Sequence, residues 1–240
     1  MKAVTSLSPL PAAQATQAAC LASWRAAGLD PVSLNHPSEY GALAGYQGLQ
    51  VVPTAATAYE QFGRHYTKVN AVIDWIEQLG EPALIINADL RLDSNATQMQ
   101  HLARLSHDGL PYLLQWNVGG EQPAVVEPYG FSAFMFHPDF ARLFAPAYLC
   151  LGQPWWDYWL PYAFVAADLP VFTPTPPIAY HARHERSWEP AHWRSCASEM
   201  ARMILPRPNT VTEAACTAFS AKVHRDIACA TVHVVFGPEE

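Results

Sequence analysis

The first half of the chain alternates short runs of β-forming residues with helical segments, and this alternation constrains the fold more than any other feature. Residues 3–7 predict a strand, and the Ala- and Gln-rich residues 12–27 predict a helix that ends at Gly28. Residues 31–35 and 49–52 predict two further strands. Strands that alternate with helices favour a mostly parallel sheet with helices on both faces.

The same alternation continues to the middle of the chain. Residues 62–79 carry apolar side chains on one helical face and predict a helix. Residues 83–86, Ala-Leu-Ile-Ile, are apolar without interruption, which is typical of a central strand buried on both sides. A helix over residues 94–106 and a strand over residues 112–116 follow. The pattern therefore predicts a Rossmann-like arrangement for this half.

The second half is richer in proline and in clustered aromatic residues. Residues 131–136 predict a strand in a mixed or antiparallel extension of the sheet, and residues 211–230 predict a helical or mixed segment. A chain of 240 residues can bury one large core, and no low-complexity linker divides it. We therefore expect a single α/β domain.

The composition narrows the class of protein. No apolar stretch approaches the roughly 20 residues that cross a bilayer. The N-terminus lacks the apolar region of a secretory signal, so we expect the mature chain to begin near Met1. Five scattered cysteines argue against a disulfide framework and a zinc knuckle, and they indicate a reducing, cytoplasmic location.

The charge is negative overall but unevenly distributed. A net charge of −7 disfavours a dedicated nucleic-acid binder, because affinity for phosphate backbones comes from accumulated Lys and Arg. Residues 181–207 nevertheless hold five arginines and three histidines. This segment is a local cationic zone in an acidic protein.

The tripeptide Asn87-Ala88-Asp89 directly follows the predicted central strand. In an open α/β sheet, ligands collect at the carboxyl ends of the strands, so these side chains are well placed for function. A divalent cation that bridges two linked phosphates needs hard oxygen ligands such as the Asp89 carboxylate. Alternatively, Asp89 and Asp93 cap a turn and the following helix.

Several segments together resemble a known family. Val-Thr-Ser-Leu-Ser-Pro near the N-terminus, Cys-Leu-Ala-Ser-Trp, Val-Ser-Leu-Asn and Ile-Ile-Asn-Ala-Asp-Leu-Arg-Leu are similar to segments of bacterial and phage-borne glycosyltransferases of the nucleotide-diphospho-sugar transferase superfamily. The resemblance covers residues 2–193 by order of elements. It implies a single GT-A-like domain, with a nucleotide-sugar-binding half (1–116), an acceptor-side half (117–205) and a C-terminal extension (206–240).

The resemblance also implies an activity. Family members transfer a sugar from a nucleoside diphosphate, UDP- or GDP-linked, to a hydroxyl acceptor with Mn²⁺ or Mg²⁺. Their strand-end Asp-x-Asp motif holds the metal and the ribose. Here Asn87 replaces the first Asp, and Asp89 matches the second.

Other nucleotide-binding residues follow from the family's order of elements. Thr5 and Ser6 match the loop that holds the base and ribose. Arg64 and Lys68, at the start of the predicted helix, are candidates for phosphate or ribose contacts, or else belong to a solvated helix face. Arg183 would offset the charge of the leaving diphosphate.

The stretch from Gly152 to Pro161 surrounds one carboxylate with tryptophans and a tyrosine. By resemblance, Asp157 is the base that deprotonates the acceptor hydroxyl in an inverting mechanism, and apolar surroundings would raise its pKa toward a useful value. Trp155 and Trp156 are suited to stacking on a sugar ring or base. The alternative is that these aromatics fill the core while Asp157 lies near a helix N-terminus.

Three further positions complete the candidate site. Glu127 and Ser132 flank a Tyr-Gly turn that resembles the family's acceptor-side turn, although a simple hairpin connection would look the same. His181 or His184, after a late predicted strand, would complete the metal shell, and we favour His181.

Three functions remain open. The first is metal-assisted glycosyl transfer to a glycan or small-molecule hydroxyl. The second is transfer to a modified DNA base, which only the cationic zone favours. The third is a non-catalytic nucleotide-sugar-binding module, which the replacement at Asn87 favours. The motifs of P-loop, dinucleotide-binding and zincin proteins do not occur.

Overall fold

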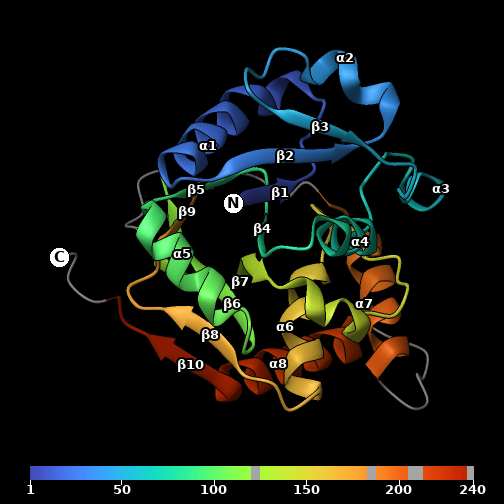
Figure 1. Ribbon diagram of the computed structural model, residues 1–240. Coiled ribbons are helices and arrows are strands. Elements are labelled where there is room, and N and C mark those ends of the chain that lie inside the picture. Colours follow the sequence, from blue (N-terminus) through green and yellow to red (C-terminus); the bar gives the residue numbers. More distant parts are fainter. Residues whose placement is uncertain (120–124, 183–187, 205–212, 237–240) are drawn as a thin grey trace.

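The computed structural model of the protein describes residues 1–119, 125–182, 188–204 and 213–236. Its strands form an α/β structure around one large mixed sheet (Figure 1). The strands are β1 (Lys2–Thr5), β2 (Asp30–Asn35), β3 (Gln50–Pro53), β4 (Ala83–Ile86), β5 (Leu90–Leu92), β6 (Leu110–Val118), β7 (Val125–Phe136), β8 (Val171–Pro174), β9 (Ala179–Ala182) and β10 (Thr231–Val234). The main path of the sheet runs β10-β8-β6-β7-β4-β1-β2-β3.

The helices connect these strands. They are α1 (Gln14–Ala26), α2 (Tyr40–Leu43), α3 (Tyr59–Phe62), α4 (Val69–Leu79), α5 (Ala96–Leu105), α6 (Trp156–Ala166), α7 (Pro190–Ile204) and α8 (Glu213–Ala230). Short 3-10 turns span Pro11–Ala13, Pro37–Glu39 and Pro138–Leu143. Within the described ranges, no helix combines the length and apolar character needed to cross a membrane.

The two halves of the sheet differ in direction. Strands β1, β2, β3 and β4 pair in parallel, as the alternation with helices predicted. Strand β7 runs antiparallel to both β4 and β6, which confirms the predicted antiparallel extension. Off the main path, β5 pairs antiparallel with β9, and β9 pairs in parallel with β6. This short ribbon carries one of the candidate site residues.

Each face of the sheet buries its own core, and β4 contributes to both. Leu84 and Ile86 pack with residues of α1 and α5, whereas Ala83 and Ile85 pack with residues of α4, α6, α7 and α8. All four side chains are fully buried, so the predicted central strand is confirmed. In Figure 1, α5 accordingly lies on one side of the sheet and α4 and α6 on the other.

Local sequence signals explain where α1 ends and where α5 begins. Gly28, which follows α1, has φ +78, and a Cβ there would lie 2.8 Å from the Cβ of Ala96 in α5. Helix α5 begins with a capping box, in which Asn95 accepts from the backbone of Gln98 and the Gln98 side chain accepts from Asn95 N. The start of α5 therefore packs against the end of α1.

The helix predicted over residues 62–79 is confirmed from Val69 to Leu79, but its first part is wrong. Helix α3 ends at Phe62, Gly63 follows in a left-handed conformation with φ +66, and α4 starts only at Val69. Lys68 has an extended backbone and forms an isolated β-bridge with Cys150. This pairing with a residue distant in sequence keeps the segment before α4 out of the helix. Consequently Arg64 and Lys68 lie in a connection before α4.

Candidate functional site

The order of the strands predicts one ligand position at the carboxyl edge of the parallel sheet, and we call this expected position the crevice. From β1 the chain proceeds outward to β2 and β3, and it then returns to β4 on the other side of β1. The order reverses between β1 and β4, and ligands of open α/β sheets bind outside the carboxyl ends of strands at such a point. The segments that leave these two ends are Ser6 onward and Asn87-Ala88-Asp89.

The turn after β4 fixes the position of Asp89. Asn87 N donates to Ser132 O of β7 at 3.0 Å, and Leu90 N donates to Asn87 O at 3.2 Å. Trp24 of α1 donates from Nε1 to Leu90 O at 2.7 Å. The Asp89 side chain remains 34% exposed. A carboxylate is therefore presented to solvent on a rigid turn at the end of the central strand.

His181 lies beside Asp89. Its Nε2 is 3.4 Å from Asp89 Oδ2, and its side chain is 19% exposed. The pairing of β5 with β9 places His181 opposite Leu90, the residue after Asp89, which explains the contact between positions so far apart in sequence. The structure thus brings together the two residues that the sequence analysis favoured as metal ligands.

Asn117 of β6 orients the His181 ring. Asn117 Oδ1 accepts from Gln115 Nε2 at 3.2 Å and lies 3.1 Å from His181 Nδ1. Because a carbonyl oxygen only accepts, Nδ1 carries the proton that it donates to Asn117. Nε2 then faces the Asp89 carboxylate, at a distance that a shared proton or a shared cation would bridge.

Ser132 of β7 stabilises the orientation of Asn117 indirectly, through Gln115. Its hydroxyl donates to Gln115 Oε1 at 2.7 Å, and the residue is 6% exposed. A chain of hydrogen bonds thus runs from Ser132 through Gln115 and Asn117 to His181, and the predicted substrate contact of Ser132 stays a prediction. Residues 129–130 belong to β7, at a place where its pairing with β6 shifts register between Phe131 and Glu127, and the side chain of Glu127 lies outside the described part of the structure.

The predicted metal shell is not formed within the described residues. Among them, no group of three or more His, Cys, Asp and Glu side chains is placed to hold a metal ion. The predicted residues Arg183 and His184 lie in the range 183–187, outside the part that the structure describes. Asp89 and His181 are thus two candidate ligands, a carboxylate and an imidazole, and this donor set suits a divalent transition metal.

The loop after β1 is held by buried polar side chains of β2. Ser33 Oγ accepts from Leu7 N at 2.9 Å, and Asn35 Nδ2 donates to Leu7 O at 2.9 Å. Thr5 is 1% exposed at the end of β1, whereas Ser6 is partly exposed. Of the two predicted nucleotide contacts, Ser6 is therefore the one whose side chain reaches the surface of the crevice.

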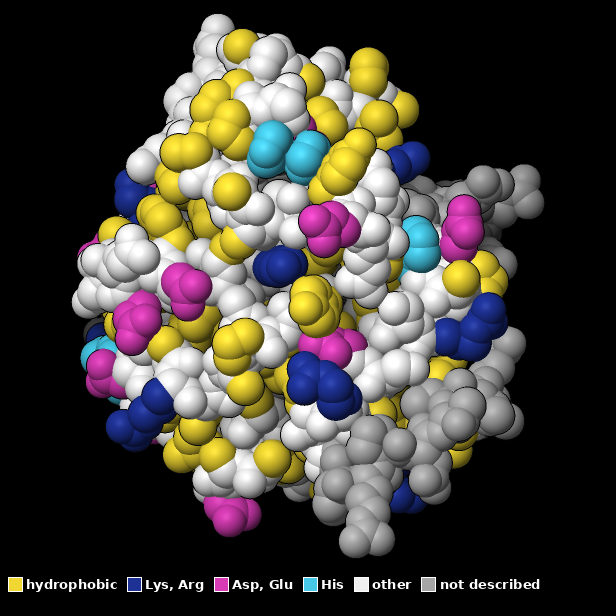
Figure 2. All heavy atoms as spheres, turned by 90° about the vertical axis from the view of Figure 1, so that its right-hand side faces the viewer, with side chains coloured by type: hydrophobic (Ala, Val, Ile, Leu, Met, Phe, Trp, Pro, Cys, Tyr) yellow, Lys and Arg dark blue, Asp and Glu magenta, His cyan; other side chains and the backbone are white. Residues whose placement is uncertain are grey.

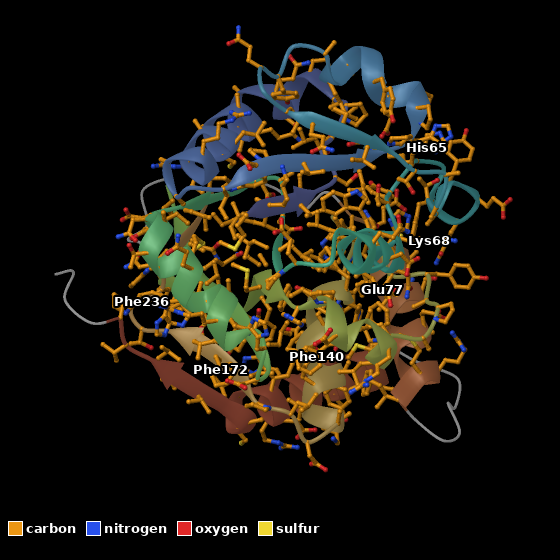
Figure 3. All side chains as sticks on the ribbon, in the orientation of Figure 1. His65, Lys68, Glu77, Phe140, Phe172 and Phe236 are labelled. Carbon is orange, nitrogen blue, oxygen red and sulfur yellow. The ribbon has the colours of Figure 1, made fainter. Side chains whose placement is uncertain are left out.

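Arg64 and Lys68 have different surroundings. Arg64 is exposed in the connection between α3 and α4. Lys68 Nζ lies 4.9 Å from the centre of the Tyr148 ring, a cation–π contact, and Figure 3 shows it beside α4. The backbone of Lys68 bridges to Cys150, so its ammonium lies beside the segment that leads to α6.

Asp157 occupies the first turn of α6, as predicted. Burial raises its pKa to about 7, although hydrogen bonds from backbone N–H groups of the same turn oppose this rise. One of these bonds runs from Tyr158 N to Asp157 Oδ1 at 3.1 Å. A carboxyl group with such a pKa can accept a proton near neutral pH, which is the property of a general base.

The predicted stacking role of Trp155 and Trp156 is wrong, because both side chains belong to the core. They are 1% and 2% exposed. Trp156 packs edge-on against Phe134 at 5.5 Å between ring centroids, and Trp155 stacks on Phe219 at 5.4 Å. The alternative interpretation, in which aromatics fill the core around the start of α6, is the one that the structure shows.

The backbone before Asp157 is strained. Trp155 has φ +77, a left-handed conformation that is uncommon for a bulky residue. Among the residues that the structure describes, its buried Nε1 and the buried Oε1 of Gln153 find no hydrogen-bond partner. Strain and unpaired polar atoms concentrate at functional sites, so these features single out the start of α6.

Sequence reasoning missed a stack of rings at the same edge of the sheet. His65 lies parallel to His36 at 3.8 Å between centroids and stacks on Tyr59 at 4.6 Å. Figure 3 shows His65 beside α3, and Figure 2 shows two histidine side chains side by side among hydrophobic ones on this face. The available signal was the position of His36 directly after the strand at residues 31–35.

Comparison with known proteins adds no assignment. Neither the protein-family models nor the curated proteins with which we compared the chain gave a match.

Proposed function

We propose that this protein is a GT-A-type glycosyltransferase, which moves a sugar from a nucleoside diphosphate to a hydroxyl acceptor. The observation that carries the proposal is the approach of His181 Nε2 to Asp89 Oδ2 at 3.4 Å. The pair lies at the carboxyl edge of the sheet, beside the point where the strand order reverses.

Asp89 and His181 would hold Mn²⁺ or Mg²⁺ in this proposal. The metal, when bound, would neutralise charge on the diphosphate leaving group. Asn117 keeps the proton on Nδ1 of His181, so that Nε2 remains available as a ligand. Ser6, at the end of β1, lies on the nucleotide side of the crevice.

Asp157 would accept the proton of the acceptor hydroxyl. Its raised pKa of about 7 and its place at the strained start of α6 support this role. A base on the acceptor and a departing diphosphate on opposite sides of the sugar lead to inversion at the anomeric carbon. Inversion is therefore part of the proposal only as long as Asp157 is the base.

The test is a comparison of Asp89→Ala and His181→Ala with the wild-type protein. Isothermal titration with UDP and GDP, with and without Mn²⁺, identifies the nucleotide, and hydrolysis or transfer of the matching nucleotide sugar gives the activity. We expect each variant to lose metal-linked binding and at least about 100-fold in activity, since each removes a ligand of a catalytic ion.

Asp93→Ala is the matched control, because this exposed carboxylate lies in the same segment. It should retain binding and activity. Full activity of Asp89→Ala would contradict the proposal. Metal-linked binding of a nucleotide without any transfer or hydrolysis would favour the non-catalytic module, and salt-sensitive binding to duplex DNA would favour a DNA acceptor.

A further inference from the structure

Thr67 connects the loop after β1 to β2 and to the segment that leads to α6, although nothing in the sequence singled it out. It is fully buried in the connection between α3 and α4. Its Oγ1 lies 2.9 Å from Ser6 Oγ in the loop after β1, and it donates to Leu34 O at 2.8 Å. Its carbonyl oxygen accepts from Leu151 N at 3.0 Å, in the segment that leads to α6.

The hydrogen-bond directions in this network can be assigned. A backbone carbonyl only accepts, so the single hydroxyl proton of Thr67 goes to Leu34 O. Thr67 therefore cannot donate to Ser6, and Ser6 must donate to Thr67 Oγ1. With its only proton used, the Ser6 hydroxyl can act toward a ligand solely as an acceptor.

The loop that carries Ser6 is also fixed in place. Ser33 and Asn35 hold both the N–H and the C=O of Leu7, and Ser33 and Asn35 are fully buried. Ser6 is partly exposed, unlike its neighbours Thr5 and Leu7. A rigid loop thus presents one hydroxyl oxygen of defined polarity to the crevice.

We propose that Thr67 is a positioning residue that sets Ser6 as a hydrogen-bond acceptor for the nucleoside part of the donor. A phosphate oxygen has no proton to offer, whereas a ribose hydroxyl or an N–H of the base does. Ser6 therefore selects the nucleoside and not the diphosphate. This inference rests on the proposed function, because it assigns a part of the same donor site.

The test uses Ser6→Ala, Thr67→Val and the double variant. Thr67→Val keeps the shape of the side chain and removes the hydroxyl, and Thr67→Ser is the conservative variant that should restore binding. The probes are the nucleotide that wild type prefers, UDP or GDP with Mn²⁺, and inorganic pyrophosphate with Mn²⁺. Dissociation constants are measured by isothermal titration, and the fold is checked by thermal unfolding.

We expect Ser6→Ala and Thr67→Val each to weaken nucleotide binding about tenfold, which is the scale of one hydrogen bond. The double variant should be no weaker than the single ones, since both act on one contact. Binding of pyrophosphate should not change. Thr67→Val should also raise KM for the nucleotide sugar more than it lowers kcat.

Three results would overturn the inference. These are an equal loss for pyrophosphate, additive losses in the double variant, and unchanged nucleotide binding by Ser6→Ala. If Thr67→Val does not fold, the comparison of the two probes on Ser6→Ala decides alone. Failure of the wild-type protein to bind either nucleotide would instead contradict the proposed function, and this inference with it.

Discussion

Replacing Asp157 with asparagine should change how the stability of the protein depends on pH. Burial raises the pKa of Asp157 from 3.8 to about 7 in the folded state. At about 1.36 kcal/mol per pKa unit, this rise corresponds to roughly 4 kcal/mol of unfolding free energy. Asp157 is partly exposed, so we expect about half of that value, roughly 2 kcal/mol.

The sign follows from the two protonation states. Below pH 4 the carboxyl group of Asp157 is protonated in both the folded and the unfolded chain. Its contribution to the free energy of unfolding is then at its maximum. Between pH 4 and about 7 the unfolded chain releases this proton while the folded one retains it. The stability of the wild-type protein therefore falls as the pH rises through this window, and the loss is complete above about pH 7.

The measurement is urea-induced unfolding of wild type and Asp157→Asn at pH 5 and pH 8. Asparagine has nearly the same shape and no titratable proton, so the variant lacks this contribution to the pH dependence. Relative to wild type, Asp157→Asn should gain roughly 1–2 kcal/mol between the two pH values. Asp74→Asn, which removes a carboxylate from the exposed face of α4, controls for the loss of one negative charge.

An unchanged difference between Asp157→Asn and wild type at both pH values would refute the reasoning. The activity gives an independent result. If Asp157 is the base, transfer by the wild-type enzyme should increase with pH up to about 7 and then level off. Asp157→Asn should bind the nucleotide normally but lose transfer. Loss of stability with full activity would instead assign Asp157 to the fold alone.

Two further predictions concern the fold. Gly28→Ala should destabilise the protein by more than Gly63→Ala in urea unfolding. Both variants place alanine at positive φ, which costs about 1–2 kcal/mol, but only alanine at position 28 also collides with Ala96. Equal losses of stability would show that α5 moves away. Asn95→Ala should cost about 1 kcal/mol by breaking the capping box with Gln98, and a change below a few tenths would show that the cap is redundant.

The sequence predicted those elements whose signal is local. The central strand at β4 and the helix ends at Gly28 and Gly80 follow from short patterns of apolar and glycine residues. The break between α3 and α4 does not. It depends on the pairing of Lys68 with Cys150, and no helical pattern records a contact over that separation.

The tryptophans show the same limit at the site. Trp155 and Trp156 fit a sugar-stacking wall as well as a core, and only the position of Phe134 on β7 and Phe219 on α8 decides between the two. Thr67 was missed for a related reason. Its importance comes from partners on three separate segments, while its own residue type is ordinary.

The contact between Asp89 and His181 depends on strand register more than on loop conformation. Strand β9 pairs with two strands at once, which places His181 opposite Leu90 on β5 and opposite Asn117 on β6. Because side chains alternate along a strand, a slip of one residue in either pairing would put Tyr180 in its place and turn the imidazole to the other face. The geometry of the Asp89–His181 pair is thus set by the sheet itself. If the pair binds a metal, as we propose, substitutions that weaken the β5–β9 pairing should damage metal-linked binding before they damage the fold.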